Sequence, residues 1–195
     1  ASAENIPDLP DDYSSSVENF SGTDVTGELN RINLSGKPPN ILIYVGSDHE
    51  KDKFEEIKSI IMETVDIHAY TVYQLLEEHI LNTPWLDNAL LLIVAAPEPI
   101  SDAASKQFLI FMSKGGKVLG LSTSFTFGGI QVKSKNELMD TVQALVFSKA
   151  KNNKIKLNIL ASGKIFQREN VEELASLETL GYLDSSDNDT MIVHL

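Results

Sequence analysis

The sequence predicts a three-layer α/β fold built on a mostly parallel sheet. Two runs, Ile41–Val45 and Ala89–Ala95, are apolar at every position, which is typical of strands covered on both faces. Between and after these runs, apolar residues recur at helical spacing. Strands that alternate with helices favour parallel pairing through right-handed crossovers. With 195 residues, 42% of them hydrophobic, the chain can bury one sizeable core.

The first half of the domain gives the clearest pattern. The first strand ends at Gly46, and a helix is predicted through Phe54, Ile57, Ile60 and Ile61. Alternation over residues 67–73 predicts a second strand, and residues 89–95 predict a third. Ser101 and Asp102 can cap a helix that runs through Lys114, after which two glycines precede a strand at residues 117–121.

The second half extends the same alternation. Ser134 can cap another helix, whose inward stripe is Leu138, Val142, Leu145 and Val146. Residues 156–161 predict a strand, 171–180 a short helix ended by Gly181, and 191–195 a final strand at which the domain is expected to be truncated. We therefore expect a flavodoxin-like strand order over residues 40–195.

Residues 1–39 predict an acidic flexible arm. They are rich in Asp, Glu, Ser, Asn and Gly, and their few apolar residues follow no regular period. Pro38 and Pro39 close this arm, because paired prolines hold the chain extended. The folded domain is expected to begin at Asn40.

Charge and composition narrow the classes of function. The net charge of −12 repels phosphates, and no local basic stripe is evident, so nucleic acid and membranes are not expected partners. The absence of cysteine excludes disulfides, thiolate metal sites and thiol nucleophiles. His49 and His79 have acidic neighbours, but such pairs are mostly solvated surface, so no metal is predicted. No signal peptide or membrane span is evident, which predicts a cytoplasmic protein.

Function is expected in the loops that follow Val45, Ala95 and Leu121, because ligands gather at the carboxyl ends of parallel strands. Gly46 and Ser47 could bind an anion at a helix N-terminus, or they could simply cap that helix. Three aromatic residues could form a docking patch or pack in the core, namely Trp85, Phe125 and Phe127.

Residues 115–129 are arranged like a nucleophile elbow, in which a strand leads into a sharp turn of small residues with glycines close by. Ser122 occupies the position of the nucleophile. The alternative is a tight turn that small residues fill. No histidine in the chain is followed two residues later by Glu, so the base and orienting carboxylate that would activate Ser122 are missing.

These stretches resemble the amino-terminal, glutamine-amidotransferase-like domain of biotin–protein ligases, and more closely the vertebrate holocarboxylase synthetases. The resemblance covers residues 38–195, and its matching stretches are Pro39–Ser47, Leu75–Glu78, Pro84–Trp85, Gly115–Gly129, Leu145–Ala150 and Met191–His194. It implies a degenerate class I glutamine amidotransferase fold, in which Ser122 stands where relatives carry Cys.

The resemblance also implies what the whole enzyme does. Biotin–protein ligases use ATP, with magnesium, to attach biotin to a lysine of carboxylases. The Gly/Arg-rich loop and the Lys-Trp-Pro-Asn-Asp stretch of the ligase centre are absent from this sequence. We therefore expect a non-catalytic module without cofactors of its own, which assists acceptor recognition or regulates the catalytic domain, in the cytoplasm and, by resemblance, in mitochondria or the nucleus. The alternatives are an amide hydrolase or amidotransferase that uses Ser122, and a structural spacer.

Overall fold

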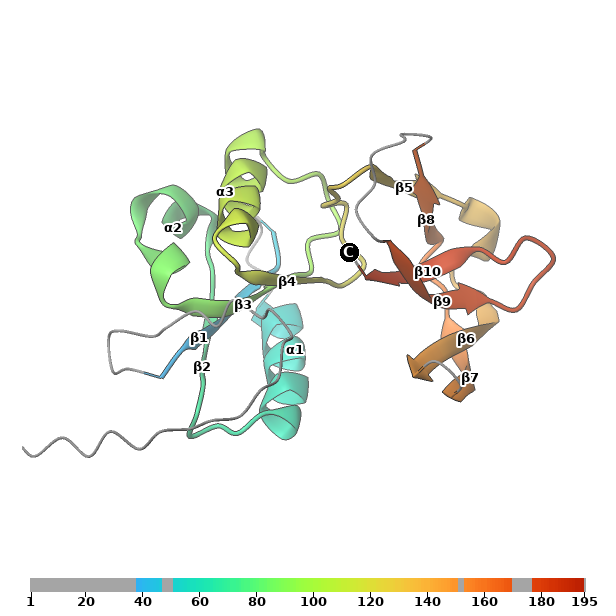
Figure 1. Cartoon of the computed structure of the whole chain (residues 1–195), viewed down its shortest axis with the longest axis horizontal. Coiled ribbons are helices and arrows are strands. Elements are labelled where there is room, and N and C mark those ends of the chain that lie inside the picture. Colours follow the sequence, from blue (N-terminus) through green and yellow to red (C-terminus); the bar gives the residue numbers. More distant parts are fainter. Residues whose placement is uncertain (1–37, 47–50, 151–152, 170–176, 195) are drawn as a thin grey trace, which may run out of the picture. The chain divides into compact units, whose positions relative to one another are not determined.

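The computed structural model of the chain describes residues 38–46, 51–150, 153–169 and 177–194. These residues form two β-sheets, one parallel with four strands and one antiparallel with six (Figure 1). The predicted arm, residues 1–39, lies outside the described residues except for Pro38 and Pro39.

The parallel sheet contains the strands that the apolar runs predict. Its strand order is β2-β1-β3-β4, and its strands are β1 (Asn40–Tyr44), β2 (Thr71–Gln74), β3 (Ala89–Val94) and β4 (Lys117–Gly120). The central strands β1 and β3 pair in parallel from Asn40 to Tyr44. Their side chains are buried on both faces, which explains why both runs are apolar throughout.

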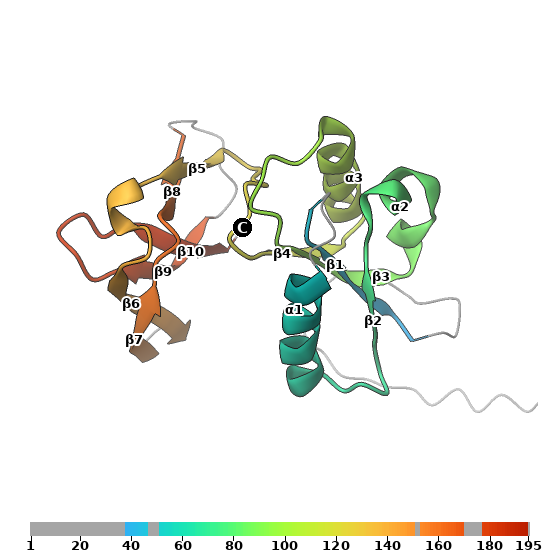
Figure 2. The ribbon, with the colours of Figure 1, turned by 180° about the vertical axis from the view of Figure 1, so that it is seen from behind.

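Helices cover both faces of the parallel sheet. Figures 1 and 2 show α1 (Lys51–Thr64) on one face and both α2 (Glu77–Asn82) and α3 (Asp102–Ser113) on the other. Alternate residues of β1 accordingly enter two cores. Ile41 and Ile43 pack with Phe54 and Ile57 of α1, whereas Leu42 and Tyr44 pack in the core that contains Phe108 and Phe111 of α3.

Helix α3 begins and ends where its capping residues predict. The Ser101 side chain accepts a hydrogen bond of 3.2 Å from the backbone N–H of Ala104, which satisfies a donor of the first turn. At the other end Gly115 has φ +81°. Gly116 then passes so close to the Phe111 ring that a Cβ there would lie 2.5 Å from it, so only glycine fits.

The antiparallel sheet occupies the second half of the chain. Its strand order is β5-β8-β10-β9-β6-β7. Its longest pairing joins β6 to β7 from Val142↔Leu160 to Ala150↔Asn153. The strands are β5 (Ile130–Ser134), β6 (Val142–Ala150), β7 (Asn153–Leu160), β8 (Lys164–Arg168), β9 (Glu178–Leu183) and β10 (Thr190–His194).

The predicted flavodoxin-like, mostly parallel fold over residues 40–195 is therefore wrong. Parallel pairing stops at β4, and all the described strands after it pair antiparallel. The cause is that the described residues after 113 contain no α-helix that could serve as a crossover. Parallel neighbours need such crossovers, whereas short connections favour antiparallel pairs.

Two predicted helices are strands. The helix expected after Ser134 is only a 3₁₀ turn, Asn136–Leu138, and its supposed inward stripe continues into β6. Val146 and Phe147 are β-branched or aromatic and pair with strands on both sides of β6, and Val142 pairs with β7. This pairing outweighs the helical spacing. Of the helix predicted at 171–180, residues 171–176 lie outside the described residues, and residues 178–180 belong to β9, which continues through Gly181.

The predicted strands at residues 156–161 and 191–195 are confirmed as β7 and β10, with shifted ends. Three further elements, α2, β5 and β8, were not predicted from the sequence. Helix α2 has six residues, fewer than two turns, which is too short for a helical period to stand out.

Candidate functional site

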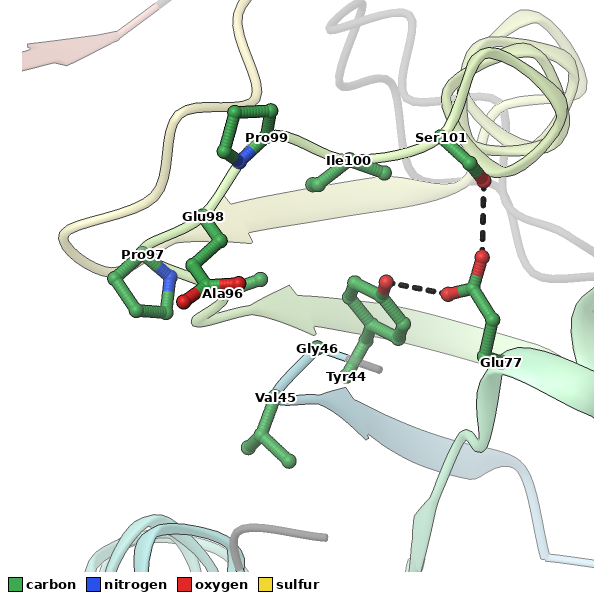
Figure 3. Close-up of a pocket in the computed structure, with 10 residues that line it drawn as sticks. All are labelled: Tyr44, Val45, Gly46, Glu77, Ala96, Pro97, Glu98, Pro99, Ile100 and Ser101. Atoms are coloured by element: carbon green, nitrogen blue, oxygen red, sulfur yellow. Dashed lines mark hydrogen bonds between the residues drawn. The ribbon is translucent and has the colours of Figure 1, made fainter. Parts of the chain in front are cut away.

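A pocket of about 250 Å³ lies at the carboxyl ends of β1 and β3 (Figure 3). The chain runs from β1 to β2 on one side of the sheet and from β3 to β4 on the other, so the β1–β3 boundary is the topological switch point where open α/β sheets bind ligands. The pocket is lined by residues 44–46 after β1, residues 96–101 after β3, and Glu77. Two of the three loops selected from the sequence therefore meet in one place.

A chain of hydrogen bonds forms one wall of this pocket. The Tyr44 hydroxyl donates to Glu77 Oε2 at 2.5 Å, and the Ser101 hydroxyl donates to Glu77 Oε1 at 2.9 Å (Figure 3). Burial of the phenol raises the pKa of Tyr44, and the neighbouring Glu77 carboxylate raises it further. Tyr44 is thus held as a neutral donor, and Glu77 has a partner on each oxygen.

The lining suits a small neutral or cationic group. It includes two carboxylates, Glu77 and Glu98, and none of the lining residues is basic. Phosphate groups need positive partners or converging backbone N–H groups, and an acidic wall opposes them. The ATP that the resemblance implies for the whole enzyme therefore does not fit this pocket.

The predicted anion site at Gly46 and Ser47 is only partly described. Gly46 lines the pocket with φ +113°, a conformation that favours glycine. Ser47 lies outside the described residues. Gly46 therefore contributes backbone to the pocket wall.

The turn after β4 has the backbone conformation expected of an elbow. Ser122 is exposed and has φ +48°, a left-handed conformation that non-glycine residues seldom adopt. Around it the backbone is held by hydrogen bonds from Leu121 N to Val94 O at 2.9 Å and from Phe125 N to the Thr123 hydroxyl at 3.1 Å. Among the residues that the structure describes, the Ser122 hydroxyl makes no hydrogen bond.

No described histidine is hydrogen-bonded to Ser122. His68 lies in the turn after α1, where its backbone N–H bonds to Asp66, and His79 lies on α2 with its Nε2 3.5 Å from Glu78. His194 is on β10, and His49 lies outside the described residues. Within the described ranges, no three His, Asp or Glu side chains gather as metal ligands.

The three predicted aromatic residues belong to one stack of rings. Trp85 is buried, and its indole N–H donates to Ile80 O at 3.0 Å. Its ring meets Phe108 and Phe111 at centroid distances of 6.2 and 5.3 Å. Phe125 contacts Phe108 at 5.5 Å and Phe127 at 5.9 Å. Trp85 is therefore a core residue, whereas Phe125 and Phe127 are half-buried and extend the stack outward.

A second hollow, of about 240 Å³, adjoins this aromatic stack. Its lining includes Phe125, the exposed Leu109 of α3, and Ser124. Pro99 and Ile100 line this hollow and the first pocket alike. Residues 99–100 thus form a shared wall between a polar pocket and a more apolar one.

Three pocket residues, Glu77, Glu98 and Ser101, were not predicted from the sequence. Glu77 comes from α2, which was not predicted, and it reaches Tyr44 across 33 positions of sequence. The pair of prolines around Glu98, directly after an apolar strand, was the one signal for a shaped loop at this edge.

Among the described residues, no helix is both long and apolar enough to cross a membrane. No family model matches the chain. A solved ThuA-like protein from Bacteroides uniformis matches 78% of this chain and 71% of its own, with a TM-score of 0.53 and 17% identity. At that identity the match establishes a shared fold.

The closer similarity is to a curated human protein, Biotin--protein ligase, which is 50% identical over 198 residues. The match covers 100% of this chain but 27% of the human protein. The chain thus spans about a quarter of the length of this relative. The resemblance to biotin–protein ligases seen in the sequence is confirmed, because the whole chain matches one segment of such a ligase.

Proposed function

We propose that this segment is a non-catalytic recognition module, which helps a biotin–protein ligase engage its acceptor protein. The whole enzyme would attach biotin to a lysine of carboxylases with ATP and magnesium, and those cofactors would bind elsewhere in it. The observation that carries the proposal is the second hollow, where the exposed Leu109 lies beside the half-buried Phe125.

Three features support binding over chemistry. Ser122 has no histidine partner among the described residues, so no described histidine is placed to take its proton. The hollow combines an aromatic ring with an exposed aliphatic residue, and such anchors carry much of the energy of protein contacts. The adjoining polar pocket offers Glu98 and Glu77, which would favour a basic side chain of the partner at the rim.

Calorimetry of the chain with a biotin-accepting carboxylase domain tests this function. The decisive variant is Leu109→Asp, which places a charge on the hollow, and its control is Leu81→Asp on α2, where the leucine is also exposed (60%, against 46% for Leu109). We expect micromolar binding that Leu109→Asp weakens at least about tenfold and Leu81→Asp leaves unchanged. If the chain binds only the catalytic region of the same ligase, the module regulates that region instead.

The second candidate is an acyl-transfer activity at Ser122, and the left-handed backbone of the elbow favours it. Incubation with an activated ester, followed by intact-mass measurement, would reveal an acyl adduct that Ser122→Ala abolishes. Absence of an adduct at Ser122 would rule out this activity for the chain by itself.

A further inference from the structure

β7 is an edge strand with an open outer side. In the part of the chain that the structure describes, it pairs only with β6, and it ends the six-stranded order. Every β7 residue except Ile159 is exposed. An edge of this kind presents backbone N–H and C=O groups that another strand can pair with.

The hairpin of β6 and β7 is basic in a strongly acidic protein. Residues 141–168 contain no Asp or Glu, although the whole chain carries a net charge of −12. The expectation that the chain has no basic stripe is therefore wrong, because the net charge of the whole chain conceals this local group of basic residues. The basic residues of this stretch are Lys149, Lys151, Lys154, Lys156, Lys164 and Arg168.

The two faces of β7 differ in chemistry. Side chains alternate along a strand, so Lys154 and Lys156 share one face and Ile155 and Leu157 share the other. Ile155 and Leu157 are 38% and 47% exposed. A strand laid along β7 would therefore meet positive charge on one face and apolar surface on the other.

The lysines also select against one class of partner. Pairing β7 with a second copy of itself would set lysines against lysines across the new ladder, and like charges in such positions are destabilising. An acidic strand paired with β7 would instead be stabilised by attraction between its carboxylates and the same lysines.

We infer that β7 is a docking edge for an extended acidic segment of a partner protein, in which Glu or Asp alternates with apolar residues. The carboxylates lie opposite Lys154 and Lys156, and the apolar residues cover Ile155 and Leu157. Backbone hydrogen bonds along the edge supply affinity, and the alternation supplies specificity.

The present contacts of the two lysines are easily exchanged. Lys156 forms an ion pair with Asp184, and both side chains are about half exposed. Lys154 lies 5.6 Å from the centroid of the Tyr182 ring. Exposed pairs of this kind contribute little to stability, so a carboxylate of the partner can replace them.

Fluorescence anisotropy with a labelled peptide of alternating Glu and Val tests the inference on the full chain. One control peptide carries Lys in place of Glu, and a second is N-methylated at alternate amides, which removes backbone pairing but keeps the charge. The variant Lys154→Glu/Lys156→Glu is compared with Lys106→Glu/Lys133→Glu, which changes the charge equally but lies on α3 and on the opposite edge strand β5.

We expect the Glu/Val peptide to bind, and the β7 variant to weaken binding at least about tenfold while the control variant retains it. Both control peptides should fail to bind. Equal binding of the N-methylated peptide would show that charge alone acts and would overturn the inference. So would absence of binding, or a preference for a single-stranded oligonucleotide over the acidic peptide.

Discussion

The Tyr44 hydroxyl and the Glu77 carboxylate, 33 positions apart in sequence, are joined by a hydrogen bond of 2.5 Å at the switch point of the parallel sheet. Tyr44 ends β1, and Glu77 begins α2. This one contact ties the central strand to a helix that sequence patterns do not reveal.

Replacing Tyr44 with Phe should lower the free energy of unfolding by about 1 to 3 kcal/mol, because the bond is to a charged acceptor. Urea denaturation followed by circular dichroism measures the change. Tyr73→Phe is the matched control, since Tyr73 is 53% exposed and its loss of a hydroxyl should change little. Equal effects of the two substitutions would contradict the assigned role.

The same bond predicts how stability changes at alkaline pH. The folded-state pKa of Tyr44 is raised above the ordinary value of 10.0, so its contribution is complete below that pH. As pH rises above it, the unfolded chain loses the proton first, and stability falls. The difference in unfolding free energy between the wild type and Tyr44→Phe should therefore change above about pH 10, with the wild type losing more. If the difference in unfolding free energy stays constant across this pH range, Tyr44 does not have the raised pKa assigned to it.

Trp85 is the single tryptophan of the chain, so its fluorescence reports on the core beside Phe108 and Phe111. Its emission should be blue-shifted in the native state and resist iodide quenching. Trp85→Ala should cost about 3 to 5 kcal/mol of stability, because it leaves a cavity and an unpaired carbonyl at Ile80. Leu81→Ala, at an exposed position, should stay within about 0.5 kcal/mol of the wild type.

Ser122 should prefer glycine. Its φ of +48° costs an ordinary side chain roughly 1 kcal/mol, which glycine avoids. Ser122→Gly should therefore unfold at a urea concentration equal to or higher than that of the wild type, and Ser122→Ala should not exceed it. A clear loss of stability in Ser122→Gly would mean that the hydroxyl makes a contact that the structure does not contain.

Lys135 holds the turn between β9 and β10. Its ammonium donates to Asp187 at 2.7 Å and to Asp189 at 2.6 Å, and the bond to Lys135 lowers the pKa of Asp187. A lowered pKa means that this stabilisation is present above the ordinary value of 3.8 and is lost as pH falls through and below it. Lys135→Gln should lose less stability on acidification than the wild type. Hydrogen exchange should speed up at residues 184–189, while the parallel sheet keeps its rates.

Strong local signals made half of the fold predictable. The apolar runs of β1 and β3 are typical only of buried strands. Ser101 marks the start of α3, and the two glycines after Lys114 mark its end. The loops after β1 and β3 could be selected as a ligand site from the rule for parallel sheets alone.

The second half could not be derived in this way because its structure depends on distant partners. In the sequence, Val142, Leu145 and Val146 have a spacing that fits a helical stripe as well as a strand. Only the pairing of β6 with β7 and β9 decides between the two. Trp85 shows the same limit. Whether it belongs to a docking patch or to the core depends on which residues contact its ring, and the sequence does not reveal these. Glu77 entered the pocket through a helix of six residues, for which periodicity gives no signal.

The wall formed by Pro99 and Ile100 has a thermodynamic consequence, because both hollows use it. Any small molecule whose binding beside Tyr44 shifts this wall changes the affinity of a partner at Leu109. By linkage, the partner must change the affinity for the small molecule by the same factor. Ligands therefore cannot bind independently at these two neighbouring sites unless the shared proline-flanked segment keeps the same position in both the free and the bound states.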